Sequence, residues 1–306
     1  MCLGWAAGQE GPILFCEPVL TPLEDRERLV QLAFEGLGAT GVFVADQAVL
    51  SLYAAGRASG LVVEYGLDKV DVTAVLDGQQ APIGAARVPV GGRQLTEHVR
   101  ALAAQRGLAL DEAIAEELKR ACLGFPAFQA APVARPGADG GAGAEAEAAR
   151  TVFALPDGQE IELKPYQEAT SGALLEPALL AAYAEPARAA HPLATAPLPD
   201  LIASLGLSLQ DRESRKAALS SILVTGAASG VKGLGPRLLR AVQSALPGSI
   251  TAGLADLPEH MPAGAAQQAA WAGGALLSKI LAAQEQWVGR GDYDENGPPA
   301  VHQRCL

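Results

Sequence analysis

Residues 44–78 read VADQAVLSLYAAGRASGLVVEYGLDKVDVTAVLDG, the most informative segment of the chain for its fold. Asp46 can cap the N-terminus of a helix, and Gly56 can end that helix at positive φ. The apolar run 61–63 predicts a buried strand, and the alternation over 70–76 predicts a second strand. A turn that contains glycine joins the two strands and can bring backbone N–H groups to an anion. The stretch therefore predicts a helix followed by a hairpin that could contact phosphate.

The segments before this stretch repeat its strand and helix pattern. Apolar runs at 13–16 and 41–44 predict buried strands. Between them, Thr21-Pro22-Leu23-Glu24 has the pattern of a capping box with proline at the first helical position. Alternating strands and helices predict an α/β core.

Farther along the chain, Pro156-Asp157-Gly158 predicts the turn of a hairpin over 152–163. The Pro-, Gly- and Ala-rich residues 132–150 lack large apolar side chains, so we expect a flexible insertion there. Residues 182–199 are expected to be irregular, and 292–306 reads as a polar tail with two prolines.

A second candidate phosphate loop is the small-residue segment 225–230, TGAASG. It follows the apolar run 222–224 and precedes a helix that begins near Leu234, and helix N-termini can hold phosphate. The alternative is an ordinary tight turn between strand and helix, which the spacing alone favours.

Composition excludes several classes of function. The 306 residues carry a formal net charge of −11, which argues against direct contact with nucleic acid. The four cysteines are scattered without C-x-x-C spacing, so we expect no metal site. We also expect an intracellular protein whose cysteines are reduced. No apolar run is long enough for a membrane helix, and the first residues lack the pattern of a signal peptide.

Six segments are distinctive in wording and order. They are QAVLSLYAAGRASG (47–60), GGRQLT (91–96), LPDGQEI (155–161), PEHMPAG (258–264), WAGGALLSK (271–279) and YDENGPPAVHQRC (293–305). These segments resemble the actin family and occur in the family's order. More narrowly, GWAAGQEGPILFCEPVLTP (4–22) and PEHMP resemble the plant and algal nuclear actin-related proteins of the seventh class.

The resemblance implies the actin-like fold, which is a two-lobed α/β ATPase fold of the ribonuclease H-like kind. We expect the N-terminal part of that fold to be truncated, because the family's first phosphate hairpin has no counterpart here. The alternatives are a truncated gene model and a genuinely shortened protein. The expected domains are subdomain 1 over 1–54 and 272–306, subdomain 3 over 55–90 and 182–271, and subdomain 4 over 91–181.

The resemblance also implies a site for ATP or ADP with Mg²⁺. Gln47 stands where the family has a glutamine that orients the attacking water, although it could serve only as a partner in helix capping. Glu64 stands where the family has the aspartate of its second phosphate hairpin, and Gly66 matches the first glycine of that hairpin. Leu67 replaces an aspartate that helps to hold metal-bound water, so a ligand is lost. Asp68 replaces the second glycine of the hairpin, which adds negative charge near the phosphate.

The rest of the implied nucleotide site also departs from the family. Asp71 replaces a histidine, and Gly226 is the only outright match in the third loop. Lys119 fits a lysine that flanks adenine, but Arg120 reverses the charge of the residue beside it, and Met261 replaces a lysine. We therefore expect no efficient ATP hydrolysis, no intact catalytic residue, and nucleotide binding that is weak or absent.

The family receives amphipathic helices of its partners in a hydrophobic cleft. Tyr53, Leu276, Leu277 and Ile280 match that cleft, and Leu276 and Ile280 are four residues apart, as binding of a helix in a groove requires. The alternative is that these side chains belong to the core, and for Leu277 the two interpretations are balanced.

The resemblance implies a non-catalytic structural subunit of a SWI/SNF-type chromatin-remodelling complex in the nucleus. Its partners would be a helix of the motor subunit and either actin or another actin-related protein. The first alternative is a cytoskeletal, cytoplasmic actin-like protein that hydrolyses ATP and polymerises. The second is a fragment without a stable fold, because strands without neighbours are unfavourable.

Overall fold

The structure is a computed structural model that describes residues 11–125, 152–262 and 264–305. The predicted insertion at 132–150 lies outside the described residues. The described strands are β1 (Ile13–Glu17), β2 (Gly41–Asp46), β3 (Gly60–Tyr65), β4 (Val70–Leu76), β5 (Gln79–Val88), β6 (Val152–Ala154), β7 (Glu160–Glu162), β8 (Ile222–Gly226) and β9 (Val288–Gly289).

Helices outnumber strands in the described part of the chain. The α-helices are α1 (Leu23–Gln31), α2 (Gln47–Ala54), α3 (Gly92–Ala104), α4 (Glu112–Cys122), α5 (Lys164–Ala173), α6 (Ala178–Ala181), α7 (Pro186–Ala189), α8 (Leu198–Ser208), α9 (Arg212–Leu219), α10 (Leu234–Ala245), α11 (Ala269–Gln284), α12 (Arg290–Asn296) and α13 (Val301–Arg304). The short π and 3-10 helices are η1 (Leu32–Gly36), η2 (Pro192–Ala194), η3 (Ala227–Gly230), η4 (Ala265–Gln268) and η5 (Pro298–Ala300).

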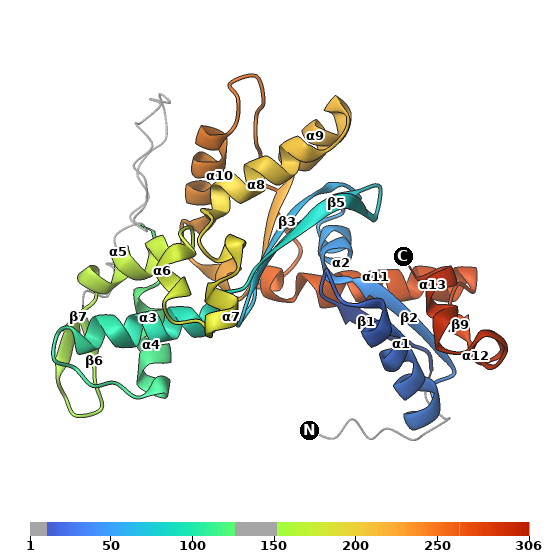
Figure 1. Ribbon diagram of the computed structural model, residues 1–306, viewed down its shortest axis with the longest axis horizontal. Helices are drawn as coiled ribbons and strands as arrows, with labels where there is room; N and C mark the ends of the chain where they lie inside the picture. Colours follow the sequence, from blue (N-terminus) through green and yellow to red (C-terminus); the bar gives the residue numbers. More distant parts are fainter. Residues whose placement is uncertain (1–10, 126–151, 263, 306) are drawn as a thin grey trace.

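Three sheets organise the described part of the chain. One has the order β1-β2-β9, with β1 and β2 parallel and β9 antiparallel to β2. The second has the order β5-β4-β3-β8, in which β3 is parallel to β8 and antiparallel to β4. The third is the β6–β7 hairpin. In Figure 1 the four-stranded sheet lies between the β1–β2 sheet at one end and the group of α3, α4 and β6–β7 at the other. This arrangement confirms the predicted α/β class.

The stretch 44–78 folds as its sequence predicts. The Asp46 carboxylate accepts a hydrogen bond of 2.7 Å from the Ala48 N–H at the start of α2, and Gly56 has a φ of +67° just after the helix. Strands β3 and β4 then pair as a hairpin whose last partners before the turn are Tyr65 and Val70. Helix and hairpin therefore occupy the places that the sequence assigns to them.

Helix α11 packs against α2 at very short range. A Cβ atom built on Gly273 would lie 1.7 Å from the backbone oxygen of Leu50, so only a bare backbone fits between the two helices. The largest core cluster lies elsewhere, where α8 and α10 cover the four-stranded sheet with buried residues such as Ile202, Ile222 and Leu238. The side chains in this cluster are apolar, so they need no hydrogen-bond partners when they are buried.

Two predictions about the ends of elements are wrong. The Thr21 hydroxyl donates to the Pro18 carbonyl at 2.6 Å, and α1 begins after Pro22 without a side-chain cap, so there is no capping box. The expected polar tail is folded as α12, η5 and α13, and its Tyr293 and Val301 are buried against β2 and η1. One aromatic and a few small apolar residues are enough to anchor this segment, although its average composition is polar.

Elsewhere the described elements agree in part with the sequence. The hairpin over 152–163 is confirmed as β6 and β7, with Gly158 at a φ of +86° in its turn. Residues 182–199 are less irregular than expected, because they contain α7, η2 and the start of α8. The subdomain boundaries stay a prediction.

Candidate functional site

The turn between β3 and β4 is fastened to the start of α3. The Gly66 N–H donates to the Lys69 carbonyl at 2.9 Å, and the Gly66 carbonyl accepts from the Gly92 N–H at 3.1 Å. The Leu67 carbonyl accepts from the Arg93 N–H at 2.7 Å. A Cβ at Gly91 would lie 2.6 Å from the Gly66 oxygen, so a glycine is required where the turn meets the helix.

The acidic residue at this turn is paired with cations. The Asp68 carboxylate accepts from the Arg93 Nε at 2.7 Å and lies 3.8 Å from the Arg188 guanidinium. These arginines hold the pKa of Asp68 below its usual range, chiefly through the hydrogen bond from Arg93. Beside it, the Leu67 side chain is 58% exposed.

A second paired carboxylate lies behind the turn. Asp71 is only 4% exposed, and it contacts the Lys69 Nζ at 2.7 Å and the Arg87 Nε at 2.8 Å. Sequence reasoning missed both cations. The signal was present, because β4 and β5 place Asp71 directly opposite Arg87, but reading it requires the strand register.

Gln47 and Glu64 meet between α2 and β3. The Gln47 amide donates to the Glu64 carboxylate. Burial and the neighbouring Asp71 raise the pKa of Glu64 to about 7, and Lys69 opposes this shift only in part. Burial also raises the pKa of Asp46, the cap of α2. The Glu64 carboxyl is therefore protonated in a substantial fraction of the molecules near neutral pH.

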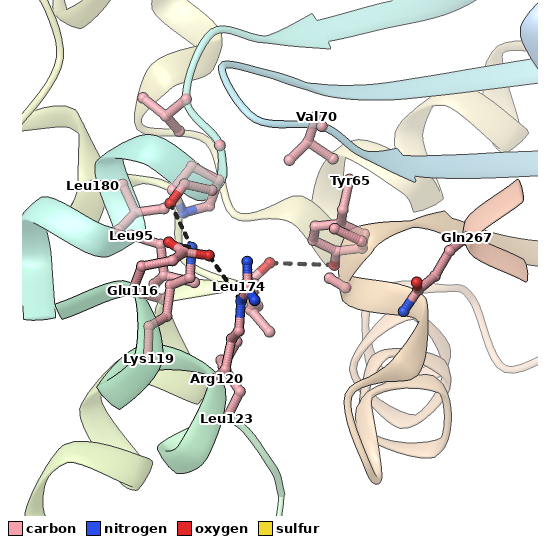
Figure 2. A pocket seen from close by; sticks show the side chains of 18 residues that line it. Tyr65, Val70, Leu95, Glu116, Lys119, Arg120, Leu123, Leu174, Leu180 and Gln267 are labelled. Carbon is pink, nitrogen blue, oxygen red and sulfur yellow. Dashed lines mark hydrogen bonds and ion pairs between the residues drawn. The ribbon is translucent and has the colours of Figure 1, made fainter. Parts of the chain in front are cut away.

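A cavity of about 480 Å³ opens on the other side of the turn. Its walls come from the β3–β4 turn, α3, α4, the segment from α5 to α6, η3 and η4, and Figure 2 shows Gln267 projecting from the side opposite Glu116, Lys119 and Arg120. Gly66 and Lys119 line this cavity. Its volume lies within the range of small-molecule sites, which is roughly 300–1,000 Å³.

The other predicted binding residues lie apart from this cavity. Met261 lines a separate cavity of about 360 Å³ together with Ser229. Gly226 has a φ of +80°, and a Cβ there would lie 2.3 Å from the Tyr65 oxygen, so this glycine serves the close approach of β8 to β3. The structure therefore brings two of the predicted cofactor-binding residues, Gly66 and Lys119, to one cavity. The other three, Glu64, Gly226 and Met261, do not line it.

Lys119 is held by neighbours within the fold. The residue is 7% exposed, and its Nζ donates to the Glu116 carboxylate, to the Thr96 hydroxyl at 2.9 Å and to the Gly92 carbonyl at 3.2 Å. The Arg120 Nε pairs with the other Glu116 oxygen at 3.2 Å. A phosphate group would have to compete with Glu116 for the Lys119 Nζ and for the Arg120 Nε. Glu116 could have been suspected from its spacing, because it lies three and four residues before them on one helix.

The predicted partner residues lie on the two helices that pack together. Tyr53 belongs to α2, and a Cβ on Gly78 would lie 2.5 Å from its hydroxyl oxygen. Leu276 and Ile280 on α11 are 45% and 49% exposed, while Leu277 is half-buried. On the same helix, Trp271 is 75% exposed.

Two kinds of feature are absent from the described residues. No cluster of three or more histidine, cysteine, aspartate or glutamate side chains there is arranged to hold a metal ion. Among the helices that the structure describes, none has the length and apolar character needed to cross a bilayer.

Comparison with known proteins covers almost the whole chain. A sequence model described as actin matches residues 6–114 and 111–306. The protein named actin-related protein 7 of Oryza sativa subsp. indica is 33% identical over 312 residues, which cover 99% of this chain and 79% of the relative. The protein of that name from Oryza sativa subsp. japonica gives the same figures, and the one from Arabidopsis thaliana is 32% identical over 310 residues, or 99% and 78%.

Proposed function

Because this chain belongs to the actin family, we propose that it is a non-catalytic structural subunit of a nuclear chromatin-remodelling complex of the SWI/SNF type. Family membership confirms the actin resemblance and the actin-like α/β fold class. It makes the chain an actin-related protein that resembles the class-seven type over nearly its whole length. The nuclear location and the complex are the proposal.

The observation that carries the non-catalytic role is the pairing of charges around the β3–β4 turn. Lys69 is engaged by Asp71, Arg93 by Asp68, and Lys119 by Glu116. Transfer of a phosphoryl group depends on positioned cations that stabilise the charge on the phosphate oxygens. Cations already bound to carboxylates supply little of that stabilisation, so we expect nucleotide binding to be weak or absent and ATP hydrolysis to be negligible.

The proposed binding surface consists of Leu276 and Ile280 on α11, with Tyr53 and Leu277 beside them. Two exposed aliphatic side chains one turn apart support the docking of an amphipathic partner helix. The proposed partner is a helix of the motor subunit of the complex, with actin or another actin-related protein beside it. The competing function is a cytoskeletal protein that binds ATP and polymerises.

The test is to purify the tagged full-length chain from nuclei and identify the proteins that accompany it. We expect a chromatin ATPase in the preparation. Recovery with filament-binding proteins and no chromatin ATPase would contradict the proposal and favour the cytoskeletal function. Release of nucleotide from the denatured protein, together with an ATPase assay, tests the non-catalytic part separately.

A matched pair of variants tests the surface. Leu276→Asp places a charge where an apolar partner would pack, so we expect recovery of the motor subunit to fall at least tenfold. Leu179→Asp is the control, because Leu179 on α6 is 46% exposed, almost the same as Leu276. Equal recovery with the two variants would exclude this surface.

A further inference from the structure

We propose that the 480 Å³ cavity beside the β3–β4 turn binds a largely apolar molecule that carries a single carboxylate. The apolar body would lie against Leu95, Leu174 and Leu180, and the carboxylate would lie at Arg120. This site is independent of the role in a complex, and it differs in ligand class from a nucleotide site.

The walls of the cavity are mostly apolar. Leu95, Leu174 and Leu180 line it, and each of them is less than 10% exposed. The one hydroxyl group in the wall, that of Tyr65, donates to the Leu174 carbonyl at 3.3 Å and is thereby satisfied within the protein. Filling an apolar cavity of this size with an apolar ligand is favourable, because the ligand's apolar surface leaves water and makes van der Waals contacts with the walls.

The charge at the rim matches one negative charge. Lys119 and Arg120 supply two positive charges, and Glu116 supplies one negative charge, so the group has a net charge of +1. Among the described residues, Arg120 reaches Glu116 through its Nε, which leaves its terminal N–H groups able to donate to a ligand. Arginine binds carboxylates well through two such donors.

The same arrangement disfavours a nucleotide. A triphosphate would bring several negative charges to a rim whose net charge is +1. Desolvating several unpaired charges is costly, whereas a single carboxylate beside an exposed arginine keeps a partner and part of its hydration.

The experiment compares two ligands of the same shape on the full-length chain, 2-naphthoate and 2-naphthalenemethanol, by titration calorimetry. We expect one binding site and an affinity for the carboxylate about tenfold higher than for the alcohol, as the gain of a charge-assisted hydrogen bond implies. Mg²⁺–ATP at millimolar concentration should leave the binding of 2-naphthoate unchanged.

Two variants locate the site. Arg120→Gln should remove the preference for the carboxylate and leave binding of the alcohol unchanged. Arg28→Gln is the matched control, because Arg28 is a similarly exposed arginine with a carboxylate partner on its own helix, remote from the cavity in the sequence. Ala228→Phe fills the cavity and should weaken both ligands at least tenfold, with thermal melting as the check on folding.

Any of three results would overturn the proposal. The first is no binding of either ligand at millimolar concentration, or equal affinities for the two. The second is a preference for the carboxylate that survives Arg120→Gln or is lost equally in Arg28→Gln. The third is displacement of 2-naphthoate by Mg²⁺–ATP, which would return the cavity to a nucleotide. Because Arg120 is 74% exposed at its side chain, its substitution keeps the test valid even if Ala228→Phe does not fold.

Discussion

At the scale of single residues, Glu64 has the most consequential charge in the candidate site. Its ordinary pKa of 4.5 is raised to about 7, first by burial and then by Asp71. The folded state therefore holds this proton more tightly than the unfolded chain does. The stabilising effect is complete below pH 4.5 and is lost as the pH rises through 7.

Glu64→Gln tests this coupling. The amide keeps the shape of the side chain and cannot ionise, so the variant should gain stability relative to the parent protein between pH 5 and pH 8. The expected relative gain is at most about 3 kcal/mol. Urea unfolding across this pH range measures it, with the exposed Glu24→Gln as the control. A difference between variant and parent that stays constant with pH would contradict the assignment.

Residue types in the candidate site were easier to predict than their partners. Gln47, Glu64 and Lys119 could be singled out from short segments, because the family resemblance gives their positions. Their partners depend on register and burial, which a sequence does not state. Lys119 was predicted to lie beside adenine, and the structure places it in the wall of the cavity. The partners of its Nζ, which are Glu116, Thr96 and Gly92, could not be predicted from the sequence.

At the scale of elements, the contact between α2 and α11 is the most demanding in the described fold. Gly273→Ala would place a methyl group 1.7 Å from the Leu50 oxygen, so the helices must separate. We expect a loss of about 3 kcal/mol in the free energy of unfolding, at the upper end of the usual cost of overpacking. The next residue provides the control, because a Cβ on Gly274 would make ordinary contacts of 3.4 Å and more.

Gly274→Ala should leave stability within about 1 kcal/mol of the parent, since alanine also favours the helix. Denaturant unfolding of both variants measures the difference. Similar losses in the two would mean that the close approach at Gly273 is not what limits the packing. Neither outcome could be anticipated from WAGGALLSK, because two adjacent glycines in one helix look equivalent until a neighbouring helix is placed.

The ends of elements show why local patterns succeed or fail. Asp46 and Gly56 were predicted correctly, because capping and positive φ are properties of a few neighbouring residues. The segment 292–306 was misread, because Tyr293 stacks on Phe34 at a centroid distance of 4.6 Å, a contact across more than 250 residues. Composition averages over such contacts and cannot reveal them.

At the scale of the whole molecule, the formal net charge of −11 leads to a prediction about nucleic acid. Contacts to phosphate supply most of non-specific binding, and an acidic surface repels the backbone. We expect no binding to duplex DNA at micromolar protein and 150 mM salt, measured by gel shift or fluorescence anisotropy. Binding that weakens steeply with salt would reveal a basic surface and contradict this expectation.

The cavity also belongs to this scale, and it could not be predicted from the sequence. Its walls bring together Gly66, Lys119, Leu174 and Gln267, and the first and last of these are more than 200 positions apart in the sequence. Sequence motifs identified two of these residues, Gly66 and Lys119. The apolar walls look like ordinary core positions until the tertiary fold leaves a space between them.

The exposed Trp271 gives the molecule a built-in optical signal. Of the two indoles in the described part of the chain, Trp287 packs edge-on against Phe43 at 6.4 Å, whereas Trp271 stands 75% exposed on α11. Light emitted by a solvated indole lies at longer wavelength and is readily quenched by dissolved iodide. Any molecule that covers this part of α11 will therefore shift the wavelength of the intrinsic tryptophan fluorescence, and docking can be followed without a label.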